Sequence, residues 1–247
     1  MLKNELFIAA LASLLTAFTV IAPWEKASHQ DDQQPTVIAP GLGTAAPSDA
    51  TVLFDGKGLS DGMELDSWSK PGGEPAGWEV QEGVMLAVRG QGPVISKQTF
   101  GDIQLHLEFA TPSKPEGSGQ GRGNSGVYLQ GRYEVQILDS YGNETYPNGQ
   151  CGAIYGQHPP LKNACRKPGE WQSYDIVFHG ARFDGDGNKT EDATLTVFHN
   201  GVLIQDHARV TATTAAAMQA EGPTPGPLYL QDHGNPVRYR NVWLREL

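Results

Sequence analysis

NSGVYLQGRYEVQILDS, residues 124–140, is the stretch that decides the fold class of this chain. It contains two strand-like runs, 126–130 and 133–138, on either side of a glycine. In the second run Glu134 and Gln136 alternate with apolar residues, and a period of two places polar side chains on one face of a strand and apolar ones on the other. The stretch therefore predicts a β-hairpin with one polar and one apolar face.

The turn of this hairpin sets which residues face each other across the two strands. A strict two-residue turn at Gly131-Arg132 would place Leu129 opposite Glu134 and mix apolar and polar side chains on one face. A longer turn or a β-bulge would restore two uniform faces, and either solution fits the sequence.

Similar short runs continue through the rest of the chain, and Gly, Pro, Asn or Asp separates most of them. Asn200-Gly201 is the strongest hairpin signal among these separators. Many short strands without a long helical pattern predict an all-β fold, either a two-sheet sandwich or a barrel, in one domain over residues 51–247. The expected strands are 51–54, 78–81, 84–87, 94–96, 103–110, 126–130, 133–138, 174–179, 193–199, 202–208, 228–231 and 237–246.

The N-terminal 50 residues are expected to lie outside this domain. Lys3 precedes the apolar run 6–22, which is typical of a secretory signal peptide, here assigned to residues 1–28. The run is also at the lower limit for a membrane-spanning helix. Residues 29–50 are rich in Pro, Gly, Ala and polar side chains and predict a flexible linker. We therefore expect an exported protein, periplasmic or extracellular, and membrane-anchored if the signal is uncleaved.

Composition narrows the class of ligand. The chain has 247 residues and a formal net charge of −10, with no basic run. Nucleic-acid binding requires concentrated Lys and Arg, so this partner is excluded, and no membrane partner is expected for the mature domain. A soluble acidic protein suits a neutral ligand such as a sugar.

Two further features concern cross-links and ions. The only cysteines are Cys151 and Cys165, and in an exported protein an isolated pair most simply forms a disulfide, worth about 3 kcal/mol on the chain-entropy model. His158 lies between them in sequence, but this set is sparse for a metal site. The run 184–188 resembles the start of a calcium loop, yet it lacks the later Gly and Glu of that motif, and a polar turn is favoured.

Two segments carry the candidate functional residues. The hairpin has Glu134 and Gln136 on one strand face, with further polar residues just before and after it. The second segment, 228–240, places a histidine, the side chain best suited to acid–base work near neutral pH, at the end of a strand. The plainer interpretation is an exposed strand face and a capped turn. The candidates are Arg122, Asn124, Tyr128, Glu134, Gln136 and Asp139 around the hairpin, and Asp232, His233 and Arg240 in the second segment.

Several motifs in order resemble the 3-keto-disaccharide hydrolase domain family. They are FDGKGLSDG, SKQTFGDIQLHLEF, NSGVYLQGRYEVQILDS, CGAIYGQHPPLKNACRKPGEWQSYDIVF and GPLYLQDHGNPVRYRNVWL. The resemblance covers the chain from about residue 50 to the C-terminus. It implies a concanavalin A-like jelly roll of the lectin and glucanase type, a two-sheet sandwich. It also implies cleavage of glycosides or disaccharides whose sugar carries a ketone at carbon 3.

This chemistry needs a base that removes the proton on carbon 2, a stabiliser for the enolate oxygen and an acid for the leaving group. On that scheme Glu134 or His233 is the expected base. The candidates for binding hydroxyls or the oxyanion are Arg122, Gln136 and Arg240. The candidates for sugar contacts are Asn124, Tyr128, Asp139 and Asp232.

No cofactor is required by this scheme, although some eliminating enzymes that act on keto-sugars use a divalent metal. Glu134, Asp139 and His233 could bind one. The alternative function is a non-catalytic, lectin-like carbohydrate-binding module, since the fold does not fix the function. A conventional endoglucanase is disfavoured because Gln136 stands where a second carboxylate would be required.

Overall fold

The computed structural model describes residues 34–57 and 65–247. The expected signal peptide, residues 1–28, lies outside these described residues. Within them, the chain has no helix with the length and hydropathy that crossing a membrane requires.

Strands make up the regular structure of the described chain, together with two single-turn 3₁₀-helices, η1 (Gly119–Gly121) and η2 (Pro147–Gly149). The strands before the second of these helices are β1 (Thr51–Phe54), β2 (Trp68–Ser69), β3 (Glu79–Gln81), β4 (Val84–Leu86), β5 (Val94–Phe100), β6 (Ile103–Ala110), β7 (Ser125–Leu129) and β8 (Tyr133–Ile137). Those after it are β9 (Gln172–His179), β10 (Arg182–Phe183), β11 (Lys189–Glu191), β12 (Ala193–His199), β13 (Val202–Val210), β14 (Gly226–Leu230) and β15 (Arg238–Glu246).

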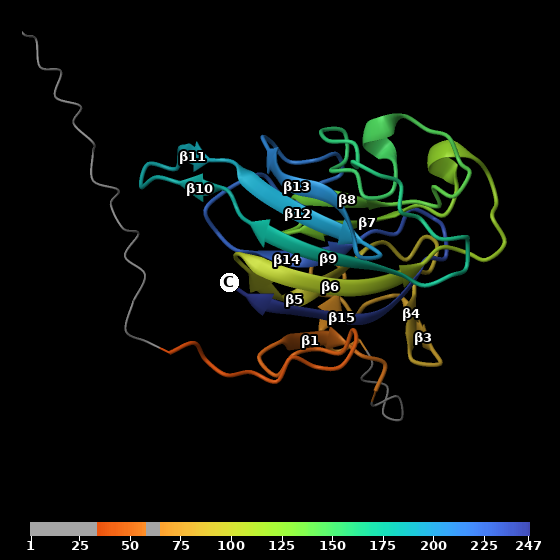
Figure 1. The fold of residues 1–247 in the computed structure, drawn as a ribbon, viewed down its shortest axis with the longest axis horizontal. Coiled ribbons are helices and arrows are strands. Elements are labelled where there is room, and N and C mark those ends of the chain that lie inside the picture. Colours follow the sequence, from red (N-terminus) through yellow and green to blue (C-terminus); the bar gives the residue numbers. More distant parts are fainter. Residues whose placement is uncertain (1–33, 58–64) are drawn as a thin grey trace, which may run out of the picture. The chain divides into compact units, whose positions relative to one another are not determined.

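Two antiparallel sheets form the sandwich. The larger has the order β13-β12-β9-β6-β15-β4-β3, with β1 also paired to β15, and the smaller has the order β2-β5-β14-β7-β8. Figure 1 shows β12, β9, β6 and β15 running side by side in the larger sheet. Strands that are adjacent in sequence pair at the edges of the sheets, as β12-β13, β3-β4 and β7-β8 do, and distant strands pair in the middle, as in a jelly roll. The predicted all-β fold with a two-sheet sandwich is confirmed.

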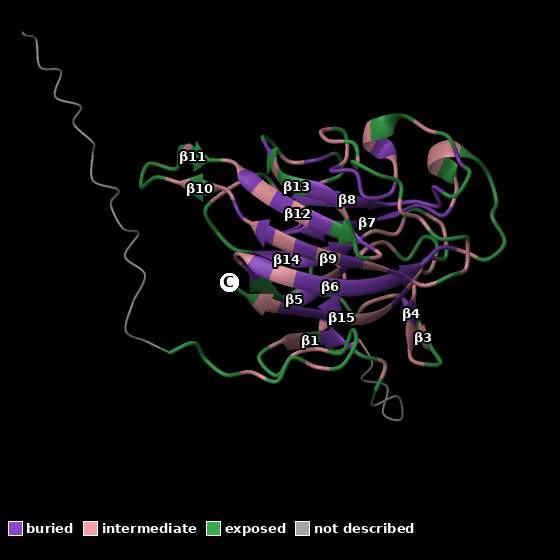
Figure 2. Cartoon of the chain, viewed as in Figure 1, coloured by how far each residue is buried: buried purple, intermediate pink, exposed green. Residues whose placement is uncertain are grey.

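The core lies between the inner faces of the two sheets. Tyr133 of the smaller sheet meets Phe178 of the larger, with ring centroids 5.7 Å apart. Two polar links cross the same interface: Tyr174 Oη donates to the Gln136 carbonyl at 2.7 Å, and Ser125 Oγ lies 2.6 Å from Tyr239 Oη. Figure 2 shows the strands mostly buried and the connecting loops mostly exposed. The apolar members of the alternating strand patterns therefore form the core, as the period of two predicts.

The hairpin turns follow the sequence signals. Asn200 and Gly201 join β12 to β13 with φ angles of 52° and 77°, the left-handed pair that a tight hairpin needs. The run 184–188 is a polar turn between β10 and β11, in which Asp184 Oδ1 accepts from the backbone amides of Asp186 and Asn188. The polar turn that the sequence favours is therefore present.

Residues 38–50 belong to the expected linker 29–50, but they pack against the larger sheet. Trp243 Nε1 donates to the Thr44 carbonyl at 3.0 Å, and Thr44 Oγ1 donates to Glu108 at 2.9 Å. Arg245 forms an ion pair with Asp49 at 2.6 Å. These contacts explain why the polar face of β6 is buried in its second half, where alternation alone predicts an exposed face. Part of the stretch whose composition predicts a flexible linker therefore covers part of the larger sheet.

The expected disulfide is not formed, because Cys151 and Cys165 are both free thiols. The two cysteines are nevertheless neighbours: together with His199 they form a group whose candidate ligand atoms all lie within 4.8 Å of one another. The proximity that the sequence predicted is therefore present, and the structure shows the two cysteines as free thiols. Both sulfurs also contact oxygen atoms, Cys151 at 3.1 Å from Tyr174 Oη and Cys165 at 3.7 Å from the Leu138 carbonyl.

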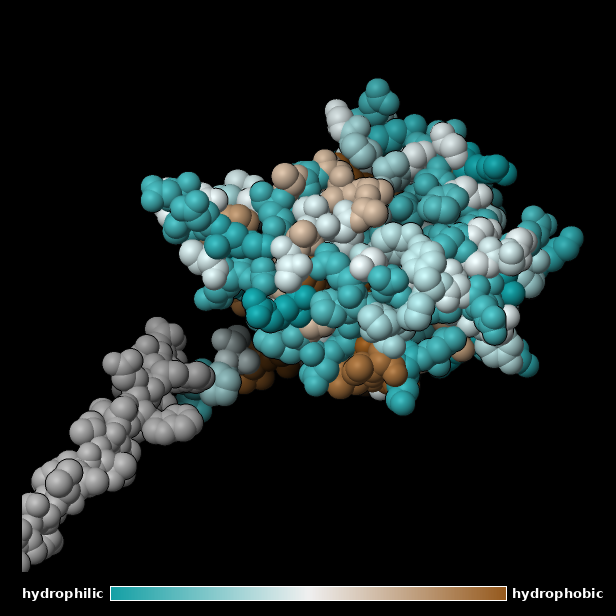
Figure 3. All heavy atoms as spheres, turned by 90° about the horizontal axis from the view of Figure 1, so that it is seen from above, coloured by the Kyte–Doolittle hydropathy of each residue, from teal (hydrophilic) through white to brown (hydrophobic). Residues whose placement is uncertain are grey.

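The surface seen in Figure 3 is mostly hydrophilic, with apolar residues in separate small patches. This agrees with the net charge of −10.

Candidate active site

A cavity of about 190 Å³ lies on the face of the smaller sheet that points away from the core. Strands β7 and β8 form its floor, the residues after β14 contribute one wall, and the segment 211–225 covers it. The lining residues are Asn124, Tyr128, Glu134, Gln136, Tyr155, Ala215, Ala216, Gln231 and His233. Five of the nine residues expected from the sequence are in this lining.

The register of β7 and β8 brings the polar residues together. Tyr128 pairs with Glu134 and Gly126 with Gln136 across the two strands, so all four share the outer face. The turn spans three residues, 130–132, and Leu129 pairs with Tyr133, which resolves the mixed faces of a two-residue turn. A longer turn is therefore the solution that this sequence adopts.

Gly126 makes room for the Glu134 carboxyl. A Cβ atom at this position would lie 2.3 Å from Glu134 Oε1 and 2.9 Å from the Tyr128 ring. Since real Cβ atoms do not approach so closely, any side chain here would displace one of the two. The glycine of the GVYL run thus has a steric role in the site.

Burial shifts the acidity of Glu134. The side chain is only 3% exposed, and burial raises its pKa from 4.5 to about 8, while the neighbouring Tyr128 hydroxyl offsets part of that rise. Burial, together with the nearby Glu134 carboxyl, also raises the pKa of Tyr128 far above its ordinary value. No Lys or Arg belongs to the described lining, so no cation opposes the effect of burial. Glu134 is therefore a carboxyl that exchanges its proton near neutral pH.

Amide groups surround this carboxyl. One atom of the Gln136 amide lies 3.0 Å from Glu134 Oε1 and 2.9 Å from the Ser125 carbonyl oxygen; we assign it as the nitrogen, which donates to both. Asn124 Oδ1 and Gln231 Oε1 are buried acceptors that have no hydrogen-bond partner. Because buried acceptors normally have donors, two unpaired ones in one lining suit a ligand rich in hydroxyl groups.

The cover over Glu134 is anchored by Arg132. Its guanidinium group donates to the carbonyls of Ala220 at 2.8 Å and Thr224 at 3.0 Å, and to the Gln130 side chain at 2.8 Å. Thr214 ties the other end of the segment, since its Oγ1 accepts from the Glu134 amide at 2.9 Å. Arg132 therefore buries Glu134 indirectly, by holding the segment 211–225 in place.

Tyr155 is a lining residue that the sequence analysis missed. Its backbone amide donates to the Glu134 carbonyl at 3.1 Å, so its segment runs beside β8. Its hydroxyl is hydrogen-bonded to that of Tyr146. The CGAIYG motif contains this tyrosine, but the sequence analysis considered only the cysteine of the motif.

Four expected residues have other partners. Arg122 donates to Asp139 at 2.6 Å, and this pair lies beside a neighbouring cavity of about 150 Å³ that Asp139 lines. Asp232 accepts from the backbone amides of Gly90, Gly92 and Gly234, as a turn-capping residue does. Arg240 lies on the larger sheet, where it forms an ion pair with Glu108 at 2.6 Å and stacks over Trp171 at 4.1 Å.

The proposed metal ligands Glu134, Asp139 and His233 do not form a ligand cluster in the described chain. The cluster of three or more such groups found there is Cys151, Cys165 and His199 instead. Asp139 is paired with Arg122, and Glu134 favours its protonated form near neutral pH. These donors do not fit a divalent metal at the cavity, so no step below is assigned to one.

The model of the 3-keto-alpha-glucoside-1,2-lyase-like domain matches residues 49–245, and the chain belongs to this family. The family predicted from the sequence motifs is therefore confirmed. Membership supports a carbohydrate-related hydrolase activity. A search of curated proteins found no match.

Solved structures from Parabacteroides distasonis ATCC 8503 agree with this assignment. One protein assigned as a glycosyl hydrolase is 43% identical, with a TM-score of 0.80, and the match covers 89% of this chain and 97% of that one. A second, also assigned as a glycosyl hydrolase, is 20% identical, with a TM-score of 0.57 and coverage of 81% and 94%. At that identity the second shows the fold alone.

Proposed function

We propose that the protein cleaves glycosidic bonds of 3-keto-glycosides or 3-keto-disaccharides by elimination and hydration, with Glu134 as the base. The observation that carries the proposal is a single buried carboxyl whose pKa is raised to about 8 in a cavity lined by amides and tyrosines. A general base is most effective when its pKa lies near the working pH. The family description, which names a 3-keto-glucoside lyase, points to the same substrate class.

The first step is removal of the proton on carbon 2 by the ionised Glu134 carboxylate. The ketone at carbon 3 acidifies this proton, and the electron pair of the broken C–H bond forms an enolate. The Tyr128 hydroxyl, which flanks Glu134, can donate a hydrogen bond to the substrate ring when it turns away from the Ala215 carbonyl, 3.1 Å away. Such a donor stabilises an oxyanion strongly in a site shielded from water.

In the second step the enolate re-forms the ketone and expels the group on carbon 1, which leaves a double bond between carbons 1 and 2. The departing oxygen takes a proton, for which His233 at the exposed side of the cavity is the candidate donor. Water then adds to carbon 1, and carbon 2 regains a proton. The net reaction consumes one water and yields the free 3-keto-sugar, as its hemiacetal, and the departing group as an alcohol, with no change in oxidation state.

The number of carboxylates separates this reaction from ordinary glycoside hydrolysis. That chemistry commonly uses two carboxylates on either side of the glycosidic bond. The described lining holds one, Glu134, and Gln136 is its nearest polar neighbour on the same strand face. A lectin-like module, the alternative function, would have no use for a buried carboxyl that titrates near neutral pH.

The test compares a 3-keto-disaccharide with its unoxidised parent sugar. We expect the purified protein to cleave only the keto-sugar, and we expect Glu134→Gln to lower turnover by about 100-fold or more, as the loss of a general base does. Glu246→Gln, at the exposed end of β15, is the matched control. Full activity of Glu134→Gln would refute the assignment of the base, and binding without cleavage by the unaltered protein would support the lectin.

A further inference from the structure

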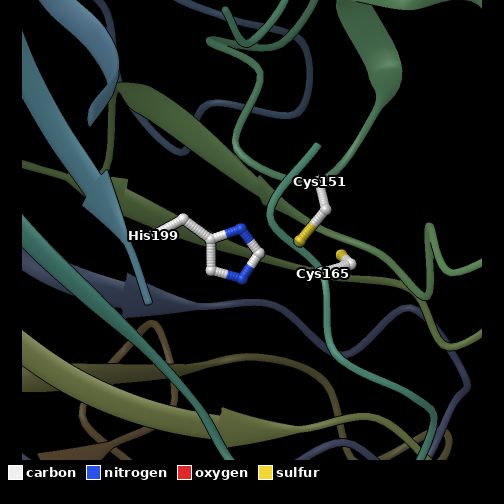
Figure 4. Close-up of side chains that lie close together, drawn as sticks. All are labelled: Cys151, Cys165 and His199. Carbon is white, nitrogen blue, oxygen red and sulfur yellow. The ribbon is translucent and has the colours of Figure 1, made fainter. Parts of the chain in front are cut away.

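A second group of reactive side chains lies away from the cavity, at the point where three segments meet. Cys151 follows η2, Cys165 lies in the loop before β9, and His199 is the last residue of β12. Figure 4 shows the two sulfur atoms side by side, facing the imidazole ring of His199. Cys151 and His199 are fully buried, while Cys165 is partly exposed.

The hydrogen bonds of His199 identify which ring nitrogen is free. The Gln172 side-chain oxygen accepts from the Arg166 backbone amide at 2.9 Å, and it lies 2.8 Å from His199 Nε2. An oxygen that is an acceptor here requires Nε2 to carry the hydrogen, so Nδ1 carries a lone pair. Nδ1 is buried and has no partner. Burial also lowers the pKa of His199 to about 4, so the ring is neutral at ordinary pH.

The ring cannot easily turn to satisfy this nitrogen elsewhere. It stacks on Phe109 at 5.8 Å and meets the edge of Tyr174 at 5.0 Å between ring centroids. An imidazole held by a hydrogen bond through one nitrogen, with the other nitrogen bare, is the arrangement found in metal-ligating histidines. A partner for His199 Nδ1 must therefore come from the groups that the ring faces.

We propose that Cys151 Sγ, Cys165 Sγ and His199 Nδ1 bind a zinc ion. Two sulfurs and one imidazole are a soft donor set, which suits zinc and excludes calcium and magnesium, because these bind oxygen ligands. The candidate ligand atoms lie within 4.8 Å of one another, so small side-chain movements bring all three onto one ion. A water molecule entering on the partly exposed Cys165 side completes four ligands.

Charge and protons balance in this site. Each thiol loses its proton on binding, so one Zn²⁺ replaces two protons and the buried group of ion and two thiolates is neutral. Burying a neutral group avoids the large cost of an unpaired buried charge. The Tyr174 hydroxyl, 3.1 Å from Cys151 Sγ, adds a contact to one sulfur.

Zinc here would brace the active-site wall. The segment that follows Cys151 runs beside β8. The backbone amide of Gln136 donates to the Ala153 carbonyl at 2.9 Å, and the backbone amide of Tyr155 donates to the Glu134 carbonyl at 3.1 Å. An ion that joins Cys151 to Cys165 and β12 therefore fixes the segment that carries Tyr155. This role is structural, and it is independent of the proposed reaction.

The test measures metal content and intact mass on the same purified protein. We expect about one zinc per chain, with no mass loss from a disulfide, and no zinc in Cys165→Ser or His199→Gln. Gln172→Ala should weaken zinc binding about 10- to 100-fold, because it removes only the group that orients the ligand. His207→Gln, an exposed histidine of β13, should retain zinc fully.

A second measurement covers the case in which the buried variants fail to fold. Removing zinc from the unaltered protein with a chelator should lower its melting temperature and expose both cysteines to alkylation. Added zinc should reverse both effects, and added calcium should not. The proposal is overturned if the protein holds copper instead, if reduced protein takes up no added zinc, or if the intact mass shows a Cys151–Cys165 disulfide.

Discussion

Replacing Glu134 by glutamine should make the fold more stable above pH 5, although it removes the proposed catalytic base. Glutamine keeps the shape of the protonated carboxyl but cannot ionise. Because the pKa of Glu134 is raised from 4.5 to about 8 in the folded protein, folding favours the protonated form. Its contribution to stability is complete below about pH 4.5 and is lost progressively as the pH rises through about 8.

The size of the effect follows from this difference in pKa. Each tenfold change in the proton equilibrium is worth about 1.4 kcal/mol, so the free energy of unfolding of Glu134→Gln should exceed that of the unaltered protein by about 3 kcal/mol at pH 7 and about 5 kcal/mol above pH 8. Near pH 4 the two should be equal. Urea unfolding at several pH values measures this difference, with Glu246→Gln as a control that should show none. A difference that stays constant from pH 4 to pH 9 would refute the reasoning, because it would mean that Glu134 titrates as an exposed carboxyl does.

Three further predictions concern the same cavity. Cleavage of a 3-keto-glycoside should increase with pH and level off above about 8, since the base acts in its ionised form; a kcat/KM that is flat or falling from pH 6 to 8 would count against Glu134. Gly126→Ala should lower kcat/KM by about tenfold or more, because the added Cβ would lie 2.3 Å from Glu134 Oε1, whereas Gly185→Ala in the exposed β10–β11 turn should leave activity unchanged. Arg132→Ala should destabilise the fold by about 3 kcal/mol, because the anchor of segment 211–225 is lost. It should also move the rising limb of the pH profile to lower pH, because water then reaches Glu134. An unchanged profile in folded Arg132→Ala would show that the segment does not set the pKa of Glu134.

Local patterns were sufficient to predict most of the strands, but not the short β2, β10 and β11, and to predict the floor of the site. Alternation in β8 placed Glu134 and Gln136 on one face, and the Asn200-Gly201 pair located a hairpin, because both features depend on a few neighbouring residues. The position of Tyr128 beside Glu134 also follows once the turn length is known. These relationships involve contacts that are close in sequence.

Partners that come from distant strands could not be predicted. Arg240 seemed available for a ligand, but its cross-strand neighbour on β6 is Glu108, and the pair neutralises itself. Asp232 caps a loop more than a hundred residues earlier in the chain. The metal candidate near the cysteines was His158 in the sequence, whereas the fold brings His199 from β12. Each outcome depends on which strands pair, and hydrophobic alternation does not specify that.

The cover of the cavity was the least predictable part. The segment 211–221, TATTAAAMQAE, could be read as a short helix, but the structure has turns and bends there. Hydrogen bonds from Arg132 and Thr214 hold it instead, and these use backbone carbonyls and amides that carry no sequence signal. The burial that raises the pKa of Glu134 therefore depends on long-range contacts of an irregular segment.

The claim that Glu134 removes a proton from carbon 2 is tested most directly by cleaving a 3-keto-disaccharide in heavy water and locating deuterium in the first-formed product. The account predicts one deuterium on carbon 2 of the released keto-sugar, well above that acquired by the same sugar incubated without protein. Glu134→Gln should give neither cleavage nor enzymatic exchange. Product that is released by the unaltered protein with its original hydrogen on carbon 2 would contradict the account.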